Sequence, residues 1–135
     1  MGRMSSLHNP AAGLTSGTSV VPASRNGGAS NADVNGSAID LRGLRGAHFI
    51  VHLGALTGAA AVAARIQTGD NPADAANANW TNVNATLYPN AAVTVKTNVN
   101  TAWEMSFDAR AGNQVRAVLV PDANVVLSSI SHVVY

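Results

Sequence analysis

His48 and His52 are the first residues in the chain whose spacing could do chemistry. On a helix, H-x-x-x-H places two imidazoles on one face for zinc, although no glutamate follows the first histidine as the metalloprotease motif requires. On a strand the two rings share a face but stand about 13 Å apart, at a rise of roughly 3.3 Å per residue. A zinc–nitrogen bond is only about 2 Å long. We therefore expect two surface or interface histidines and no metal site.

The carboxylates also form no convincing catalytic or metal-binding set. Asp70 and Asp74 could offer oxygens to calcium, but their loop lacks the central glycine and terminal glutamate of an EF-hand, so a polar turn is expected. Glu104 and Asp108 share one face of a strand in AWEMSFDAR, too far apart to match the roughly 5 Å carboxyl separation of a retaining glycosidase. No Gly-x-Ser-x-Gly elbow is present. We predict a protein that is not an enzyme and binds no cofactor, metal or small-molecule substrate.

The low content of charged residues is the most informative feature of the composition. Asp, Glu, Lys and Arg make up 11% of the 135 residues, while 47% are apolar. Ordinary soluble domains have roughly 25% charged residues. A surface this poor in charge suggests a component of an assembly whose exterior is covered by other protein. A small monomer with a neutral, polar surface is the alternative.

Charge and hydropathy also limit the possible partners. The net charge of +1 gives no electrostatic footprint for nucleic acid or for an anionic membrane. No apolar stretch is long enough to span a bilayer, and the N-terminus has no apolar signal region. The chain has no cysteine, so stability must come from packing or from oligomerisation.

The chain divides into an arm and a domain. Residues 1–35 are rich in Gly, Ser, Asn and Ala without a sustained period, which predicts a flexible N-terminal arm. Within it, two valines before a proline could dock as a short extended piece on another surface. Residues 36–135 are predicted to form one β-sandwich domain. The candidate partner contacts are Val20, Val21, Pro22 and Arg25 in the arm, and Arg42 and Arg45 in the LRGLRG turn.

Short apolar segments separated by turn residues predict about eight strands. We expect them at residues 37–42, 46–54, 60–68, 79–87, 91–97, 101–109, 113–120 and 125–134. Such spacing indicates an all-β fold, either an antiparallel two-sheet sandwich or a barrel. Residues 59–66 are alanine-rich, so a short helix is the alternative there. Trp103, Met105 and Phe107 alternate with polar residues and are predicted to lie in the core.

From about residue 38 the chain resembles a family of capsid decoration, or cement, proteins of tailed bacteriophages. The residues that carry the resemblance are AIDLRGLRGAHFIVHLGALTG, then ARIQTGDNPADAANANWTNVN, then QVRAVLV before a terminal hydrophobic strand. These motifs cover about three quarters of the chain in the family's order. The Ala- and Asn-rich loop at 70–79 and the lower charge depart from the family pattern.

The resemblance implies a jelly-roll β-sandwich that forms homotrimers at local three-fold positions on the outer capsid surface. There it would bridge subunits of the major capsid protein, after synthesis in the host cytoplasm. Binding to the assembled lattice alone would stabilise that lattice by mass action. Two alternatives are another phage head or tail component and a carbohydrate-binding β-sandwich module. The latter would need Trp80, Trp103 and Tyr88 exposed and coplanar.

Overall fold

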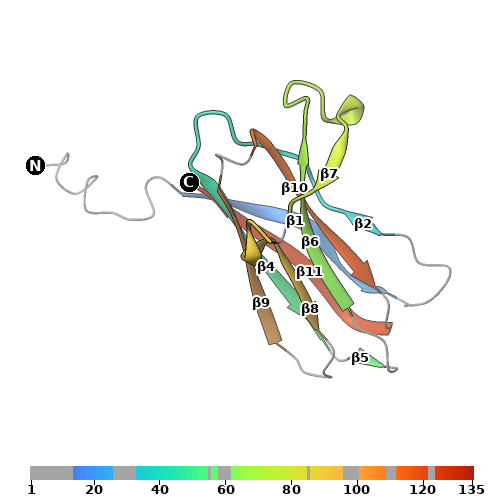
Figure 1. Ribbon diagram of the computed structural model, residues 1–135. Coiled ribbons are helices and arrows are strands. Elements are labelled where there is room, and N and C mark those ends of the chain that lie inside the picture. The colour runs from blue at the N-terminus through green and yellow to red at the C-terminus, as the bar shows by residue number, and fades with distance from the viewer. Residues whose placement is uncertain are drawn as a thin grey trace, which may run out of the picture.

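The strands form two antiparallel sheets packed face to face (Figure 1). The computed structural model describes residues 14–25, 33–54, 56–57, 62–84, 86–95, 101–108, 112–121 and 124–135. Its strands are β1 (Thr15–Arg25), β2 (Val34–Asn35), β3 (Ile39–Asp40), β4 (Gly46–Leu53), β5 (Leu56–Thr57), β6 (Val62–Gly69), β7 (Trp80–Asn82), β8 (Ala92–Val95), β9 (Thr101–Asp108), β10 (Gln114–Pro121) and β11 (Asn124–Val134). Two 3₁₀ turns, η2 (Ala75–Asn77) and η3 (Pro89–Ala91), lie in the connections.

The strand order is that of a jelly roll. One sheet, here called sheet A, has the order β1-β11-β4-β9, and the other, sheet B, has the order β2-β10-β6-β7. The short strands β3 and β8 pair with β10 and β6, so β2 with β3 and β7 with β8 each act as one interrupted strand. Counted in this way, and leaving aside the two-residue strand β5, the domain has eight strands. The chain passes from one sheet to the other at every connection between them except that from β6 to β7. This is an eight-stranded jelly roll, so the predicted all-β sandwich is confirmed.

The core fills the space between the two sheets, because each long strand buries alternate side chains. In sheet A, β4 turns Ala47, Phe49, Val51 and Leu53 inward, and β9 turns Met105 and Phe107 to meet them. Sheet B contributes Val62, Ala64 and Ile66 from β6 together with Val115, Ala117 and Leu119 from β10. Trp103 packs against this cluster from its margin. The predicted inward orientation of residues 103, 105 and 107 is therefore confirmed.

Residues 15–25, predicted from composition to belong to a flexible arm, form β1 at the edge of sheet A. This strand pairs with β11 from Thr15, opposite Val134, to Arg25, opposite Val125. Its register shifts after Thr18, and the extra residue turns Val20 into the core opposite Ile130. A β-bulge of this kind breaks the period of two that identifies a strand in a sequence. The remaining parts of the predicted arm, residues 1–13 and 26–32, lie outside the described residues.

One glycine joins the edges of the two sheets. The Gly36 N–H donates to the carbonyl of Ala117 in β10 at 2.7 Å, and the next N–H, that of Ser37, donates to Ser19 in β1 at 2.9 Å. A Cβ on Gly36 would stand 2.6 Å from the Ala117 oxygen and 3.1 Å from the Ser19 oxygen. Only a residue without a side chain fits between these two carbonyls, so Gly36 closes this side of the sandwich.

The sequence left two questions open in sheet B: whether the alanine-rich segment is a strand or a helix, and how far the strand predicted at 79–87 extends. The alanine-rich residues 62–66 lie in a strand, since β6 is paired on both sides by β10 and by β7 and β8; residues 59–61 are outside the described ranges. The strand predicted at 79–87 is wrong beyond Asn82. There the Asn84 side chain accepts a bond from the Thr86 N–H at 2.9 Å, and its carbonyl accepts from Tyr88. This local turn competes with strand pairing.

Candidate functional site

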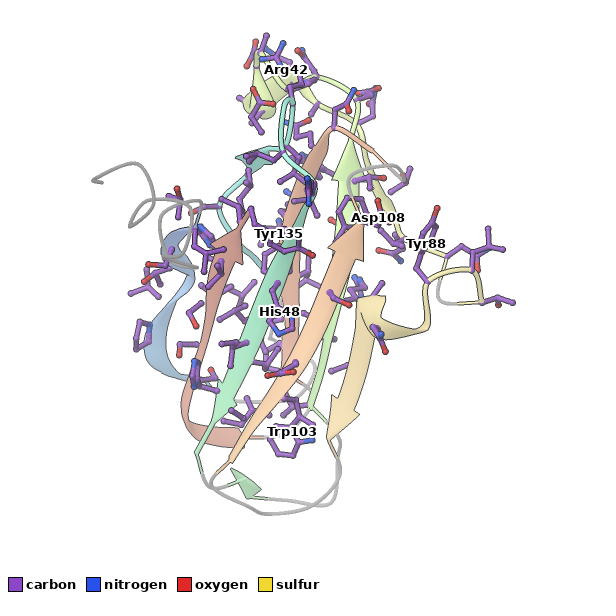
Figure 2. The ribbon with its side chains drawn as sticks, turned by 90° about the vertical axis from the view of Figure 1, so that its left-hand side faces the viewer. Arg42, His48, Tyr88, Trp103, Asp108 and Tyr135 are labelled. Carbon is purple, nitrogen blue, oxygen red and sulfur yellow. The ribbon has the colours of Figure 1, made fainter. Side chains whose placement is uncertain are left out.

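Two adjoining hollows lie at the end of the sandwich where β4 begins and β9 and β11 finish, here called the Tyr135 end. The larger, of about 630 Å³, is lined by Leu41, Gly43, Leu44, Arg45, Ser106, Phe107, Asp108, Asn113 and Tyr135. The smaller, of about 160 Å³, is lined by Leu87, Tyr88, Asn90, Ser106 and Asp108. Ser106 and Asp108 belong to both hollows. Together the two hollows form a groove across β9, with Tyr135, Asp108 and Tyr88 along it (Figure 2).

The shape of this groove follows from strand alternation and one glycine. Phe107 points into the core and forms part of the floor, while its neighbours Ser106 and Asp108 face outward on β9. Gly46 lies opposite Asp108 in β4, and a Cβ there would collide with the Phe107 carbonyl and approach the Tyr135 hydroxyl at 3.1 Å. The absence of a side chain at Gly46 therefore lets the Tyr135 ring lie low against the sheet, beside the larger hollow.

The backbone holds Tyr135 firmly in this position. Its carbonyl accepts bonds from the N–H groups of Arg45 at 2.6 Å and Gly46 at 3.2 Å, and its own N–H donates to the Gly46 carbonyl at 3.2 Å. The loop between β3 and β4 is fixed by the Leu41 N–H, which donates to Asn113 at 2.7 Å. The walls of the larger hollow are thus built on hydrogen-bonded elements of both sheets.

The groove combines an apolar floor with polar walls. Leu41 and Phe107 are buried beneath it, while Asp108, Arg45 and the Ser106 hydroxyl provide an anion, a cation and a neutral hydrogen-bonding group. Its larger hollow falls within the roughly 300–1,000 Å³ typical of ligand pockets, which pair apolar lining with a few polar groups. Such a surface can hold a chain segment or a small amphipathic molecule.

The structure places the four partner contacts predicted in the arm in different environments. Val20 is a core residue with 2% exposure, so its prediction as a partner contact is wrong; the bulge in β1 turns it inward. Val21, the next residue, is 70% exposed, and Pro22 is exposed as well. Arg25 pairs through its backbone with Val125, and its side chain is outside the described set. The sequence pair Val20-Val21 thus contributes one residue to the core and one to the surface.

The two arginines of the LRGLRG turn are both exposed and have separate roles. Arg42 forms a fork with Asp40, from its Nε at 3.0 Å and its Nη2 at 2.6 Å. The hydrogen bonds from Arg42 hold the pKa of the Asp40 carboxyl below its usual value, and they raise the pKa of Arg42. Arg45 instead lines the larger hollow. They do not form a joint basic patch for phosphate.

The two histidines of β4 lie on the outer face of sheet A and have different neighbours. His48 Nε2 lies 3.4 Å from the carboxylate of Glu104, and His52 Nε2 lies 3.1 Å from the Ser131 hydroxyl. In the described part of the chain, no three metal-ligating side chains gather at one point. The expectation that these histidines share a strand face is confirmed.

The acidic loop between β6 and β7 is braced by its own asparagines. Asp70 accepts from the Asn79 N–H at 2.8 Å and from its side-chain amide at 2.9 Å. These bonds lower the pKa of Asp70 below its usual value. Asp74 accepts from the Asn77 side chain at 2.5 Å. Both carboxylates therefore stabilise a polar turn, as the residue types predict.

A polar network on the outer face of sheet B has no counterpart in the sequence-based predictions. The guanidinium of Arg116 lies 4.3 Å from the centroid of the Trp80 ring, and its Nε donates to Gln67 at 2.9 Å. Gln67 in turn donates to Asn82 at 2.9 Å. Burial lowers the pKa of Arg116. The residues come from three strands, so only the strand register brings them together.

Beside this network, buried Gln114 anchors the β6–β7 loop. Its Oε1 accepts the Asn71 N–H at 3.1 Å and rests against Gly69.

The aromatic residues do not form one platform. Trp80 lies on the outside of sheet B under Arg116, whereas Trp103 and Tyr88 pack against the core from other sides. In Figure 2, Trp103 lies near the bottom of the molecule, whereas Tyr88 lies about halfway up its right-hand side. The coplanar arrangement that a carbohydrate-binding module would need is therefore absent from these three rings.

A half-buried polar pair lies where β1 joins β11. The Oγ of Ser19 is 2.7 Å from Nδ1 of His132, whose ring packs edge-on against Phe49 at 6.3 Å between centroids. Burial lowers the pKa of His132 below its ordinary value of 6.5.

Comparisons with known proteins give no relatives from which a function could be transferred. Within the described residues, no helix has the length and apolar character needed to cross a membrane. The chain matches no protein-family model, no curated protein and no solved structure.

Proposed function

We propose that this chain is a structural virion protein that binds the outer surface of a tailed-phage capsid and stabilises the lattice of the major capsid protein. The unit that binds would be a homotrimer at local three-fold positions. The proposal draws on the resemblance in the sequence, on the low charge of the chain and on the jelly-roll fold. Jelly rolls are common in viral capsids but also occur in lectins and cupins, so the fold alone does not decide the function.

The observation that carries the proposal is a charge-poor area on the outer face of sheet A, bounded on one side by Glu104 and Asp108 of β9. On sheet A, the outward side chains of β1, β11 and β4 form a surface without Asp, Glu, Lys or Arg among the described side chains. We call it the uncharged face; it consists of Ser16, Thr18, His48, Ile50, His52, Ser129, Ser131 and Val133. Depletion of charge is a compositional mark of the centre of protein interfaces.

Sheet B and its adjoining turn, by contrast, carry several charged side chains. Arg65 pairs there with Asp33, Arg42 pairs with Asp40, and Arg116 covers Trp80. Charged side chains of this kind suit a surface in contact with water. We therefore orient the protein with the uncharged face against the capsid and sheet B towards the solvent.

A trimer would bind the capsid more tightly than a single copy. Three linked copies act at a high effective concentration, so the avidity exceeds the affinity of one copy without any new contact. Because the protein would bind only the assembled lattice, it would shift the equilibrium towards the intact shell.

Cosedimentation tests this proposal. Heads of the phage that encodes this chain, prepared without the protein, are mixed with increasing amounts of purified protein and pelleted. We expect saturable binding and heads that withstand a higher temperature. Ser131→Lys places a charge at the centre of the uncharged face and should abolish binding. Asn35→Lys, at an exposed strand position on the outer face of sheet B, is the matched control and should bind normally. Equal binding by both variants would refute the proposed orientation, and no binding by the unmodified protein would refute the function.

A further inference from the structure

Three polar side chains form a row across the outer face of sheet B. Arg116 in β10 lies opposite Gln67 in β6, which lies opposite Asn82 in β7 (Figure 1). We call these three residues the Arg116 row. From the hydrogen-bond directions and the charge of this row, we infer that it is a recognition site for an Asp or Glu carboxylate on a different partner protein. The inference goes beyond the proposed function and does not depend on capsid binding.

The hydrogen bonds within the row all run in one direction. A guanidinium can only donate, so the bond of 2.9 Å from Arg116 Nε makes Gln67 Oε1 the acceptor. The Gln67 amide nitrogen then donates to Asn82 Oδ1 at 2.9 Å. In the part of the chain that the structure describes, the Arg116 Nη groups, the Asn82 amide nitrogen and the Trp80 indole N–H have no hydrogen-bond partner. The row therefore offers donors to a ligand that accepts hydrogen bonds.

Arg116 is held in position before a ligand binds. Its guanidinium lies 4.3 Å from the centroid of the Trp80 ring, and its Nε is bonded to Gln67. The two terminal nitrogens remain, and they form the end-on fork with which arginine binds a carboxylate through two parallel hydrogen bonds. A side chain that is already ordered loses less conformational entropy on binding. Arg and Trp are also enriched among the residues that dominate the binding energy of protein interfaces.

Arg116 is a cation without a counter-charge in the described structure. On the same side of the sandwich, Arg65 pairs with Asp33. None of the carboxylates that the structure describes lies within ion-pair distance of Arg116. Arg116 is half-buried, and burial lowers its pKa because a charged group loses solvation there. A carboxylate supplied by a partner would offset this loss.

The chemistry of the row favours an acidic protein side chain over a phosphate polymer or a sugar. Because Asp33 neutralises Arg65, the row contributes a single unpaired cation, which matches a single carboxylate. Phosphate polymers are bound by clusters of Lys and Arg. A sugar would need an open aromatic face, but Arg116 covers the Trp80 ring. An Asp or Glu side chain needs only the fork and displaces nothing.

An NMR titration of the isotope-labelled full-length protein with a capped oligoglutamate peptide tests the inference. We expect saturable shifts of the Trp80 indole and Asn82 side-chain signals, and no shifts with oligoglutamine of the same length. Arg116→Lys keeps the charge but loses the fork and the bond to Gln67, so it should weaken binding roughly tenfold or more. The matched control is Arg45→Gln, which removes one positive charge from the exposed loop between β3 and β4 and should bind normally.

A second pair of variants changes the charge without changing the size of a side chain. Asn82→Asp retains an acceptor for Gln67 but replaces the free donor with a negative charge, so it should abolish binding. Asn90→Asp adds the same charge at an exposed position beside the smaller hollow and should bind normally.

The outcomes separate the possible ligands. Absence of saturable shifts at the row would overturn the inference, as would equal weakening by Arg116→Lys and Arg45→Gln, since binding would then follow net charge alone. Tighter binding of oligogalacturonate or of inorganic phosphate than of oligoglutamate would overturn the choice of a protein partner. Shifts of the same signals when the protein alone is concentrated would also overturn it, because a second copy would then fill the site. Failure to bind capsids would leave these results unaffected.

Discussion

Replacing Gly36 by alanine should weaken the closure between the two sheets. The new Cβ would stand 2.6 Å from the Ala117 carbonyl and 3.1 Å from the Ser19 carbonyl. Both oxygens belong to backbone that already accepts hydrogen bonds from the Gly36–Ser37 segment, so neither can move without lengthening those bonds. The steric conflict therefore acts on both sheets at once.

The magnitude can be worked from these contacts. Overpacking of a well-packed site costs about 1–3 kcal/mol, and each hydrogen bond contributes about 0.5–1.5 kcal/mol net. Because the two hydrogen bonds would be weakened and not lost, we expect the free energy of unfolding to fall by about 2–4 kcal/mol. For a domain of this size, 1 kcal/mol corresponds to about 4 °C in Tm, so Tm should fall by about 8–16 °C.

Urea and thermal unfolding followed by circular dichroism measure this loss at a fixed protein concentration. Gly43→Ala is the matched control, because Gly43 has a φ of 82° but no heavy atom within 4 Å of the point where an alanine methyl group would lie. That control loses only the left-handed backbone preference of glycine, about 1 kcal/mol. If Gly36→Ala is no less stable than Gly43→Ala, the role of Gly36 in joining the sheets is wrong.

Three further perturbations address the core, the loop anchor and the half-buried His132. Phe49→Ala should reduce the free energy of unfolding by about 3–5 kcal/mol in urea titrations, since Phe49 is fully buried. Gln114→Ala leaves the Asn71 N–H without its acceptor, so that amide should exchange with deuterium much faster than in the unmodified protein. Burial lowers the pKa of His132 below 6.5, so folding favours the neutral ring, and stability is lost as the pH falls through 6.5 towards the folded pKa. In urea titrations between about pH 7.5 and 5, His132→Asn should show a shallower decline than the unmodified protein.

Alternation of side chains predicted the centre of each sheet well. In β4 and β9, apolar residues occur at every second position, so the inward orientation of Phe49, Met105 and Phe107 could be derived from a period of two alone. Alanine-rich β6 was ambiguous because helix propensity and strand pairing compete there. Pairing with neighbours on both sides outweighs that propensity, and no single-segment pattern contains this information.

Strand β1 could not be recognised because its pattern is interrupted. Ser16, Gly17 and Thr18 offer no apolar alternation, and the register shifts on either side of Val20 and again after Ala23. A Gly, Ser and Thr composition resembles that of a linker. Only the presence of β11 as a partner makes this segment a strand.

The candidate site was equally hidden from the sequence. Its walls come from the β3–β4 loop, from β9 and from the end of β11, so Leu44, Ser106 and Tyr135 are far apart in the chain and share no motif. The network of Trp80, Arg116 and Gln67 depends in the same way on strand register. Long-range pairing, which a single sequence does not specify, creates both surfaces.

The most direct test of the proposed role is a titration of decoration-free heads with purified protein, followed by sedimentation. We predict that the protein pellets with the heads and saturates at a fixed number of copies per particle, with the bound species having three times the 13.7 kDa mass of the chain. Protein that remains in the supernatant as a monomer at every concentration would contradict the proposal that its uncharged face binds a capsid.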